Sequence, residues 1–240
     1  MVNDENTSGE TLLSVIESII RSDTEIIAEV ERLKVRGPDK SVAEIASEII
    51  VMYSNRSAIS GGASALPALI PGWGTLVTMV GSALLDTALL LKFEVEMSLA
   101  LSWNAGFDIR ESSERQMAFL LASISTYDIR NGDNFIVDVL QAEGVAIWNY
   151  APRQVSKVLL IVLGRLALMN AGKSMLKALP LVGVAIGSGV NKYLTTRIGN
   201  QCTERLQERL TNQAEIRAHE GEEEPIVDAI FKDEPEAGNV

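Results

Sequence analysis

Few residues in this 240-residue chain have the types and spacing that catalysis or metal binding requires. Cys202 is the only cysteine and His219 the only histidine. One thiol excludes an internal disulfide, and one imidazole leaves too few ligands for a His/Cys zinc site. A histidine in a charged tail is also poorly placed for a nucleophile triad. We therefore expect no catalytic residues, no metal and no cofactor.

Residues 167–174, with the sequence Ala-Leu-Met-Asn-Ala-Gly-Lys-Ser, match the loose pattern of a phosphate-binding loop. A working loop needs glycines that free its backbone amides, a preceding strand, and a later Asp that holds magnesium. Here the interior of the pattern favours helix, and so does the sequence that follows. We interpret the segment as a surface turn or helix, with Lys173 in solvent, and not as a nucleotide site.

Asp86 is the one charged residue in a long apolar stretch, so it is a candidate buried charge. An unpaired carboxylate in apolar surroundings costs several kcal/mol or becomes neutral. We expect a partner, either a Lys or Arg of residues 153–209 or the cap of a neighbouring helix. The alternative is that Asp86 faces water.

The formal charge of −11 is unevenly distributed along the chain. Residues 153–209 contain nine Lys and Arg against two Glu, whereas residues 210–240 contain nine acidic residues against two basic ones. The basic segment either pairs within the molecule or faces an anionic lipid surface. The candidate lipid-facing cations are Lys157, Arg165, Lys173, Lys177, Lys192 and Arg197.

Composition and periodicity predict an all-α protein. The chain is 47% hydrophobic but only 5% aromatic, and its apolar residues are mostly Ala, Leu, Ile and Val. Apolar residues three and four apart predict an amphipathic helix over 10–35, which Gly37 and Pro38 end. Ser41 and Glu44 have the spacing of a capping box and predict the start of a second helix. Residues 213–240 are predicted to be a mostly disordered acidic tail.

Residues 57–85 carry no charge and are long enough to cross a bilayer. Prolines and glycines around Pro71 interrupt them, leaving a second arm from Thr75 that continues as a helix to Trp103. The six leucines, two valines and one methionine of that arm are together worth about −3 to −5 kcal/mol on insertion scales, which Asp86 and the polar residues about cancel. We expect either a hairpin that lies at or re-enters a membrane interface, or an ordinary buried hairpin.

Residues 178–191 form another uncharged stretch, in the most basic part of the chain. Gly183 and Gly187 are four apart, so on a helix they lie on one face and allow a second helix to approach closely. We predict that this face crosses the second arm, Gly74–Leu91. The alternative is that the glycines only allow bends. The predicted helix-packing motif consists of Pro180, Gly183, Gly187, Gly189 and Asn191.

The segment Ala178–Gly199 is similar to the closing signature of the EcsC protein family. Gly61-Gly62, the turn Pro71–Gly74, Asp86 and Trp103–Asp108 follow in the order of that family's pattern, and the resemblance covers roughly residues 40–205. Lys192 separates Asn191 from the aromatic residue that the family's pattern places next to it. The resemblance implies a bacterial, helical, often membrane-associated protein, in a family named for a member encoded beside an ABC transporter. It brings no catalytic residues.

These observations predict an N-terminal amphipathic helix over 1–39, a single EcsC-like helical domain of packed apolar hairpins over 40–212, and the acidic tail over 213–240. We expect a non-enzymatic cytoplasmic protein that lies on, or partly in, the inner face of the membrane, with an accessory role in transport as one expected function. Its expected partner is an anionic lipid or a membrane protein, and not nucleic acid. The first alternative is a soluble helical scaffold without membrane contact, and an enzyme is the second. The sequence gives no prediction of oligomeric state.

Overall fold

The computed structural model describes residues 2–60, 82–131, 151–171 and 183–222, with the backbone alone at several helix ends. Within these ranges the chain is helical and contains no strand, which confirms the all-α prediction. The helices are α1 (Val2–Ile19), α2 (Asp23–Arg36), α3 (Val42–Ser60), α5 (Ser82–Asn104), α6 (Ser112–Asn131), α8 (Pro152–Ala171) and α9 (Gly183–Glu222).

The N-terminal segment is two helices and not the single helix predicted over 10–35. The break occurs at Ser22, whose side chain accepts a hydrogen bond from the backbone N–H of Glu25 while Glu25 accepts one from the backbone of Ser22. This capping box starts α2, because it satisfies backbone donors that a continuous helix would bond to the preceding turn. The apolar spacing continues across the break, so periodicity alone did not reveal it.

Local signals set the other described boundaries. Gly37 caps the end of α2, and the predicted capping box of Ser41 and Glu44 starts α3. Gly106 follows α5 with φ of 98°, a conformation that glycine adopts at little cost. Pro152 is the first residue of α8, where its missing N–H leaves no helical hydrogen bond unmade.

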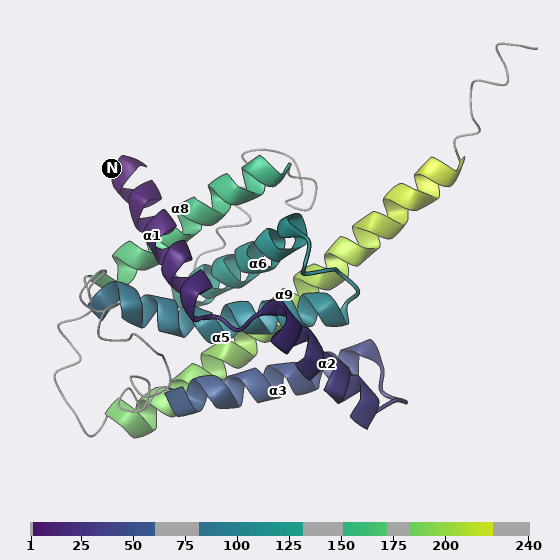
Figure 1. Cartoon of the computed structure of the whole chain (residues 1–240), viewed down its shortest axis with the longest axis horizontal. Coiled ribbons are helices and arrows are strands. Elements are labelled where there is room, and N and C mark those ends of the chain that lie inside the picture. The colour runs from purple at the N-terminus through teal and green to yellow at the C-terminus, as the bar shows by residue number, and fades with distance from the viewer. Residues whose placement is uncertain (1, 61–81, 132–150, 172–182, 223–240) are drawn as a thin grey trace, which may run out of the picture.

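Helix α5 runs through the centre of the bundle, and all six other described helices pack against it (Figure 1). It is apolar on every side, as expected of a helix surrounded by others. Helices α1 and α8 cross on one side of it, and α3 packs along α9 on another. Both α1 and α2 belong to this core. Its fully buried members include Leu12, Ile16, Ile26, Ile49, Leu91, Leu99, Leu120 and Val162.

Two polar contacts establish the direction of the helices along α3. Asn104, at the end of α5, donates to the carbonyl of Val42 at the start of α3 over 2.9 Å, and Thr195 of α9 donates to Ser57 near the end of α3 over 3.0 Å. Both α5 and α9 therefore run antiparallel to α3. The last turn of α3 and the first turns of α5 and α9 therefore lie on the same side of the bundle (Figure 1), and we call this side the α3/α5/α9 end.

The C-terminal part of α9 extends well beyond the other helices (Figure 1). It continues to Glu222, so the chain remains helical past residue 212, the predicted boundary of the helical domain. Glu, Ala and Arg, which favour helix, recur in the sequence of its last turns and are consistent with this extension. The rest of the predicted disordered tail, residues 223–240, lies outside the described part of the chain.

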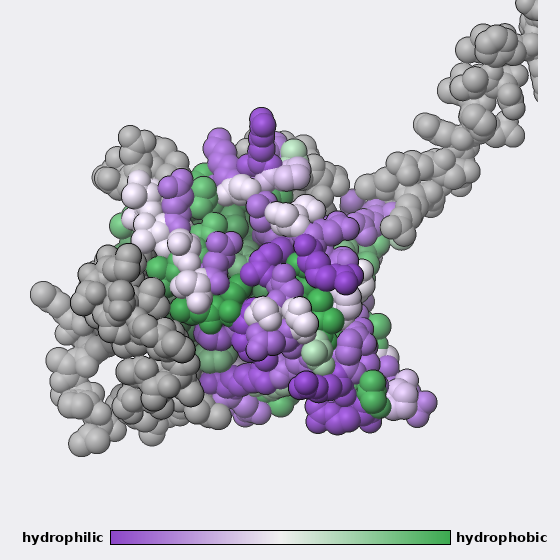
Figure 2. Space-filling view, viewed as in Figure 1, coloured by the Kyte–Doolittle hydropathy of each residue, from purple (hydrophilic) through white to green (hydrophobic). Residues whose placement is uncertain are grey.

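The hydropathy of the surface differs between two parts of the face that Figure 2 shows. Hydrophilic residues cover most of the face over α2 and α3, whereas hydrophobic residues reach the surface beside α1. None of the described helices combines the length and the hydropathy needed to cross a bilayer.

Candidate functional site

Six side chains from four elements meet in what we call the Tyr53 cluster. Its members are Arg21, Glu29, Tyr53, Arg56, Lys92 and Glu96. Arg21 lies between α1 and α2, and its guanidinium is 2.8 Å from Glu29 and 3.1 Å from Glu96. Arg56 of α3 and Lys92 of α5 provide further ion pairs to Glu29 and Glu96. The cluster therefore fastens α2 and α3 to the central helix.

Electrostatics fix the protonation states in the Tyr53 cluster. Burial raises the pKa of Tyr53 and keeps it a neutral phenol, whose oxygen accepts a hydrogen bond from Arg21. Burial also opposes ionisation of Glu29, but the hydrogen bonds from Arg56 and Arg21 outweigh it and lower the pKa of Glu29 to about 2. A phenol and a carboxylate held in these states are poor bases and poor nucleophiles at neutral pH. The arrangement is suited to holding helices together.

A second group of polar side chains lies inside the bundle between α5, α6 and α9. Glu94 of α5 is fully buried, and its Oε2 lies 2.7 Å from Oγ1 of Thr126 on α6. Ser98 donates to the carbonyl of Ala118 over 2.8 Å. Burial raises the pKa of Glu94, while the charge of Arg130 and the hydrogen bond with Thr126 act in the opposite direction. This interior is the part of the described core richest in polar groups.

Cys202 of α9 completes that interior. Its sulfur is 3.6 Å from Oγ of Ser125, and the thiol is fully buried. Burial raises the pKa of the thiol, which keeps it protonated and unreactive, since the thiolate is the nucleophilic form. Among the described residues, no group of three potential ligands could hold a metal ion.

Two arginines one turn apart attach α9 to α6. Arg205 donates to Asp128 over 2.9 Å, and both side chains are buried. Arg209 makes two parallel hydrogen bonds of 2.6 Å to Glu114, and its guanidinium stacks 4.1 Å from the ring centre of Phe107. Bidentate Arg–carboxylate pairs are among the stronger polar contacts in proteins. At these two positions the basic segment 153–209 pairs within the molecule, which is one of the two alternatives predicted from its charge.

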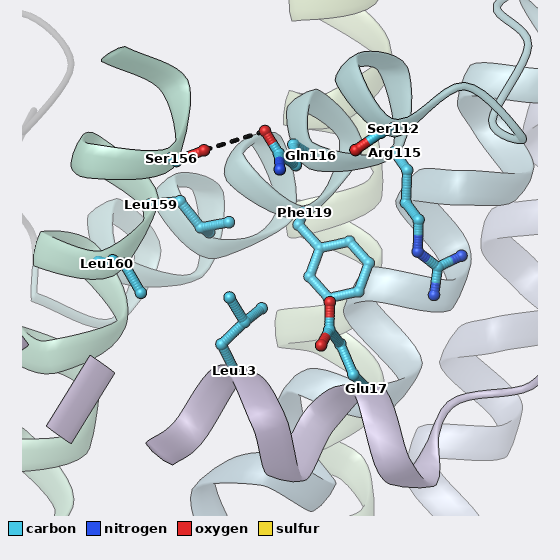
Figure 3. Close-up of a pocket in the computed structure, with 9 residues that line it drawn as sticks. All are labelled: Leu13, Glu17, Ser112, Arg115, Gln116, Phe119, Ser156, Leu159 and Leu160. Carbon is cyan, nitrogen blue, oxygen red and sulfur yellow. Dashed lines mark hydrogen bonds between the residues drawn. The ribbon is translucent and has the colours of Figure 1, made fainter. Parts of the chain in front are cut away.

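A cavity of about 140 Å³ lies between α1, α6 and α8 (Figure 3). Leu13, Phe119 and Leu159 point into it, while Ser156 donates to Gln116 over 3.0 Å at its edge. Arg115 turns away from the cavity and pairs with Asp23 at the start of α2. A cavity of this volume holds a molecule about the size of benzene, and its walls are mostly apolar.

The structure describes only part of the predicted helix-packing motif. Gly183 is the first residue of α9 and Gly187 is helical, but their packing and Pro180 lie outside the described part of the chain. Gly189 is exposed, and an added Cβ there would meet no described atom within 4 Å. It therefore makes no close contact with the described helices, and the predicted crossing with Gly74–Leu91 stays a prediction, because residues 74–81 lie outside the described part of the chain. Asn191 is half-buried on α9.

Four of the six predicted lipid-facing cations lie on two of the described helices. Lys157 is exposed on α8 and Arg165 is half-buried there, whereas Lys192 and Arg197 are exposed on α9. Lys173 and Lys177 lie outside the described residues, as does the end of the phosphate-loop pattern. The pattern's first residues belong to α8, which supports their interpretation as helix. The side chain of Asp86 is not among those described, so its buried pairing stays a prediction.

Several residues that shape the interior were missed by sequence reasoning. The sequence places Glu94 and Glu96 on a continuing helix without marking them as buried, yet both are 1% exposed. The sequence signal that could identify them is the apolar character of α5 on every side, because charged residues within such a helix are buried with it. Gly9 and Gly199 also lie at close helix contacts, and neither belongs to the pair Gly183 and Gly187 that the sequence predicts.

Comparison of this chain with protein-family models, with curated proteins and with solved structures gives no match.

Proposed function

We propose that this chain is an EcsC-like, non-enzymatic protein that binds the cytoplasmic face of a membrane through its α3/α5/α9 end. The proposal joins the resemblance of residues 178–199 to the EcsC signature with the direction of the described helices. In the sequence, the uncharged residues 61–81 stand between the last residue of α3 and the first residue of α5. An accessory role in transport belongs to the proposal through the resemblance alone.

The observation that carries the proposal is the surface of α9 at this end. Val190 is 47% exposed and Tyr193 is 59% exposed, and Lys192 lies between them. The guanidinium of Arg197 lies 5.9 Å from the ring centre of Tyr193. Apolar and aromatic side chains next to cations are typical of surfaces that lie at an anionic membrane interface.

The magnitudes favour reversible attachment. Each cation close to an anionic leaflet is worth about 1 kcal/mol, so Lys192 and Arg197 together supply about 2 kcal/mol. Partial burial of Val190 and Tyr193 in the headgroup region adds about 1–3 kcal/mol. Such a surface holds a peripheral protein at low salt and releases it as salt screens the charges.

Vesicle flotation tests the proposal directly. We expect the full chain to float with vesicles of phosphatidylcholine and phosphatidylglycerol at low salt, and much less with phosphatidylcholine alone. The double variant Lys192→Glu with Arg197→Glu should lower the partition coefficient at least tenfold. The matched control is Arg32→Glu with Arg36→Glu, two exposed cations on α2 away from this end, which should float like the unmodified chain.

Equal flotation with neutral and anionic vesicles, or an equal effect of both double variants, would contradict the proposal. Failure to float with either vesicle would favour the soluble scaffold. That alternative is favoured by Arg205 and Arg209, which pair within the molecule and leave fewer cations of the basic segment for lipid.

A further inference from the structure

Two glutamates on α5 occupy equally buried positions but receive very different hydrogen bonds. Glu96 accepts from the backbone N–H of Arg21 over 2.9 Å, from Nε of the same arginine over 3.1 Å, and from Lys92. All three groups are donors only, and two of them carry charge. Glu96 is therefore an ionised carboxylate, stabilised by the Tyr53 cluster.

Glu94, two residues earlier, contacts a hydroxyl group that already has another partner. Oγ1 of Thr126 is 2.7 Å from Oε2 of Glu94 and also 2.7 Å from the carbonyl oxygen of Ala122. A hydroxyl group has one proton and can donate to only one of these two oxygens. The other oxygen also lies at hydrogen-bond distance from Oγ1 of Thr126. A hydrogen bond at that contact therefore needs a proton from a group other than the Thr126 hydroxyl.

Only one arrangement gives every short contact a proton. If Thr126 donates to an ionised Glu94, the oxygens of Thr126 and Ala122 face each other at 2.7 Å with no proton between them. If Thr126 donates to Ala122, its oxygen accepts from a protonated Glu94, and both contacts are hydrogen bonds. Peptide carbonyls cannot supply a proton, so the carboxyl group of Glu94 must.

The charges around Glu94 determine up to what pH it keeps its proton. Arg130 of α6 is the described charge that acts on Glu94 and favours its ionisation, and Cys202 of α9 is its titratable neighbour. Arg205 of α9 pairs with Asp128, and Arg56 of α3 pairs with Glu29 of α2. Within the described part of the chain, no charge of α1 or α8 adds to the shift. Burial outweighs Arg130 and raises the pKa of Glu94.

We propose that Glu94 is a proton-binding site in the interior of the bundle, held as a neutral carboxylic acid that donates to Thr126 and links the packing of α5 on α6 to uptake of one proton. This inference is independent of membrane binding. It assigns opposite protonation states to Glu94 and Glu96, which share a helix and a degree of burial. No sequence pattern distinguishes the two.

The consequence for stability has a definite sign. In the unfolded chain Glu94 ionises near its ordinary pKa of 4.5, whereas in the folded chain it keeps its proton to higher pH. The folded state therefore binds more protons between these two values, and stability decreases as pH rises through that window. The unfolding equilibrium constant should increase about tenfold for each pH unit there, until Glu94 ionises in the folded state.

Urea unfolding of the full chain between pH 5 and pH 9 compares Glu94→Gln with Glu96→Gln. Glutamine imitates a neutral acid, so Glu94→Gln should keep or increase stability at pH 7 and remove the decrease with pH. Glu96→Gln leaves Arg21 and Lys92 without their carboxylate, so it should raise the unfolding constant at least tenfold at pH 7. Equal destabilisation by both variants, or an unchanged pH dependence in Glu94→Gln, would overturn the proposal.

Infrared spectroscopy of the unmodified protein provides a readout that does not depend on a variant folding. A protonated buried carboxyl group has a C=O stretch well separated from that of a carboxylate. We expect this band at neutral pH, and we expect it to disappear in Glu94→Gln and persist in Glu96→Gln. Its absence from the unmodified protein at neutral pH would refute the neutral state of Glu94 even if both variants failed to fold.

Discussion

The carboxylate of Glu29 shows how a single residue joins three elements of this bundle. Arg21 approaches it from the segment before α2 and Arg56 from α3, over 2.8 Å and 2.9 Å for two of the hydrogen bonds. Both arginines also lie over the ring of Tyr53. Removing this one charge leaves two partly buried cations facing each other, so its effect should exceed that of an ordinary surface pair.

Glu29→Gln should lower the free energy of unfolding by about 2–4 kcal/mol at pH 7, because it breaks a largely buried ion pair on one side only. The pKa of Glu29 is lowered from 4.5 to about 2, so its contribution is complete above pH 4.5 and is lost as pH falls towards 2. The difference between the variant and the unmodified protein should narrow over that window. Chemical unfolding at several acidic pH values measures it.

Glu48→Gln is the matched control for this residue. Glu48 pairs with Lys40, and both side chains are 39% exposed, so water screens the pair and its loss should cost less than about 1 kcal/mol. Similar losses from Glu29→Gln and Glu48→Gln would show that the Tyr53 cluster adds no more stability than a surface pair.

At the scale of the helices, close packing depends on glycines at crossings. A Cβ at Gly9 of α1 would overlap the backbone carbonyl of Leu160 on α8. A Cβ at Gly199 of α9 would lie 2.8 Å from Cγ1 of Ile50 and 3.0 Å from the sulfur of Met97. The first obstacle is backbone and the second is flexible side chain, so the two positions should tolerate a methyl group differently.

Alanine substitutions at three glycines test this ranking by thermal and urea unfolding. Gly9→Ala should destabilise most, by about 1–3 kcal/mol or more, because neither backbone can move without disturbing a packed helix. Gly199→Ala should cost less, since Ile50 and Met97 can change rotamer. Gly189→Ala is the control and should stabilise the protein by up to about 1 kcal/mol, because its site is open and alanine favours helix. A neutral Gly9→Ala would show that α1 and α8 are not in close contact at this residue.

For the whole molecule, the N-terminal helix is an integral part of the core. Helix α1 buries Leu12, Val15, Ile16 and Ile19. It packs mainly against α8 and the central helix α5. At about 1.5–3 kcal/mol for each large side chain, this burial is comparable to the net stability of about 5–15 kcal/mol of a typical protein.

Deletion of residues 1–21 should therefore abolish cooperative thermal unfolding and cause aggregation, because it exposes the apolar sides of α5 and α8. The comparison is deletion of residues 223–240, which removes none of the described core and should leave the melting temperature nearly unchanged. Calorimetry of the two truncated chains gives the answer. A cooperative transition in the chain without residues 1–21 would instead support a separate N-terminal element, as the predicted boundary at residue 39 implies.

The sequence alone determined the helical class, because apolar residues recur every three or four positions and capping signals such as Ser41 with Glu44 act within one turn. It also predicted an apolar helix from Thr75 to Trp103, but it left open whether that helix is buried in a bundle or lies at a membrane interface, and the packing of α5 among six helices came from the structure. Only the tertiary structure decided which helices cross at Gly9 and Gly199, and which donors meet Glu94 and Glu96. Those partners lie far along the chain, and one helical period places many residues on the same face. The choice among them depends on packing of the complete bundle, which no local pattern records.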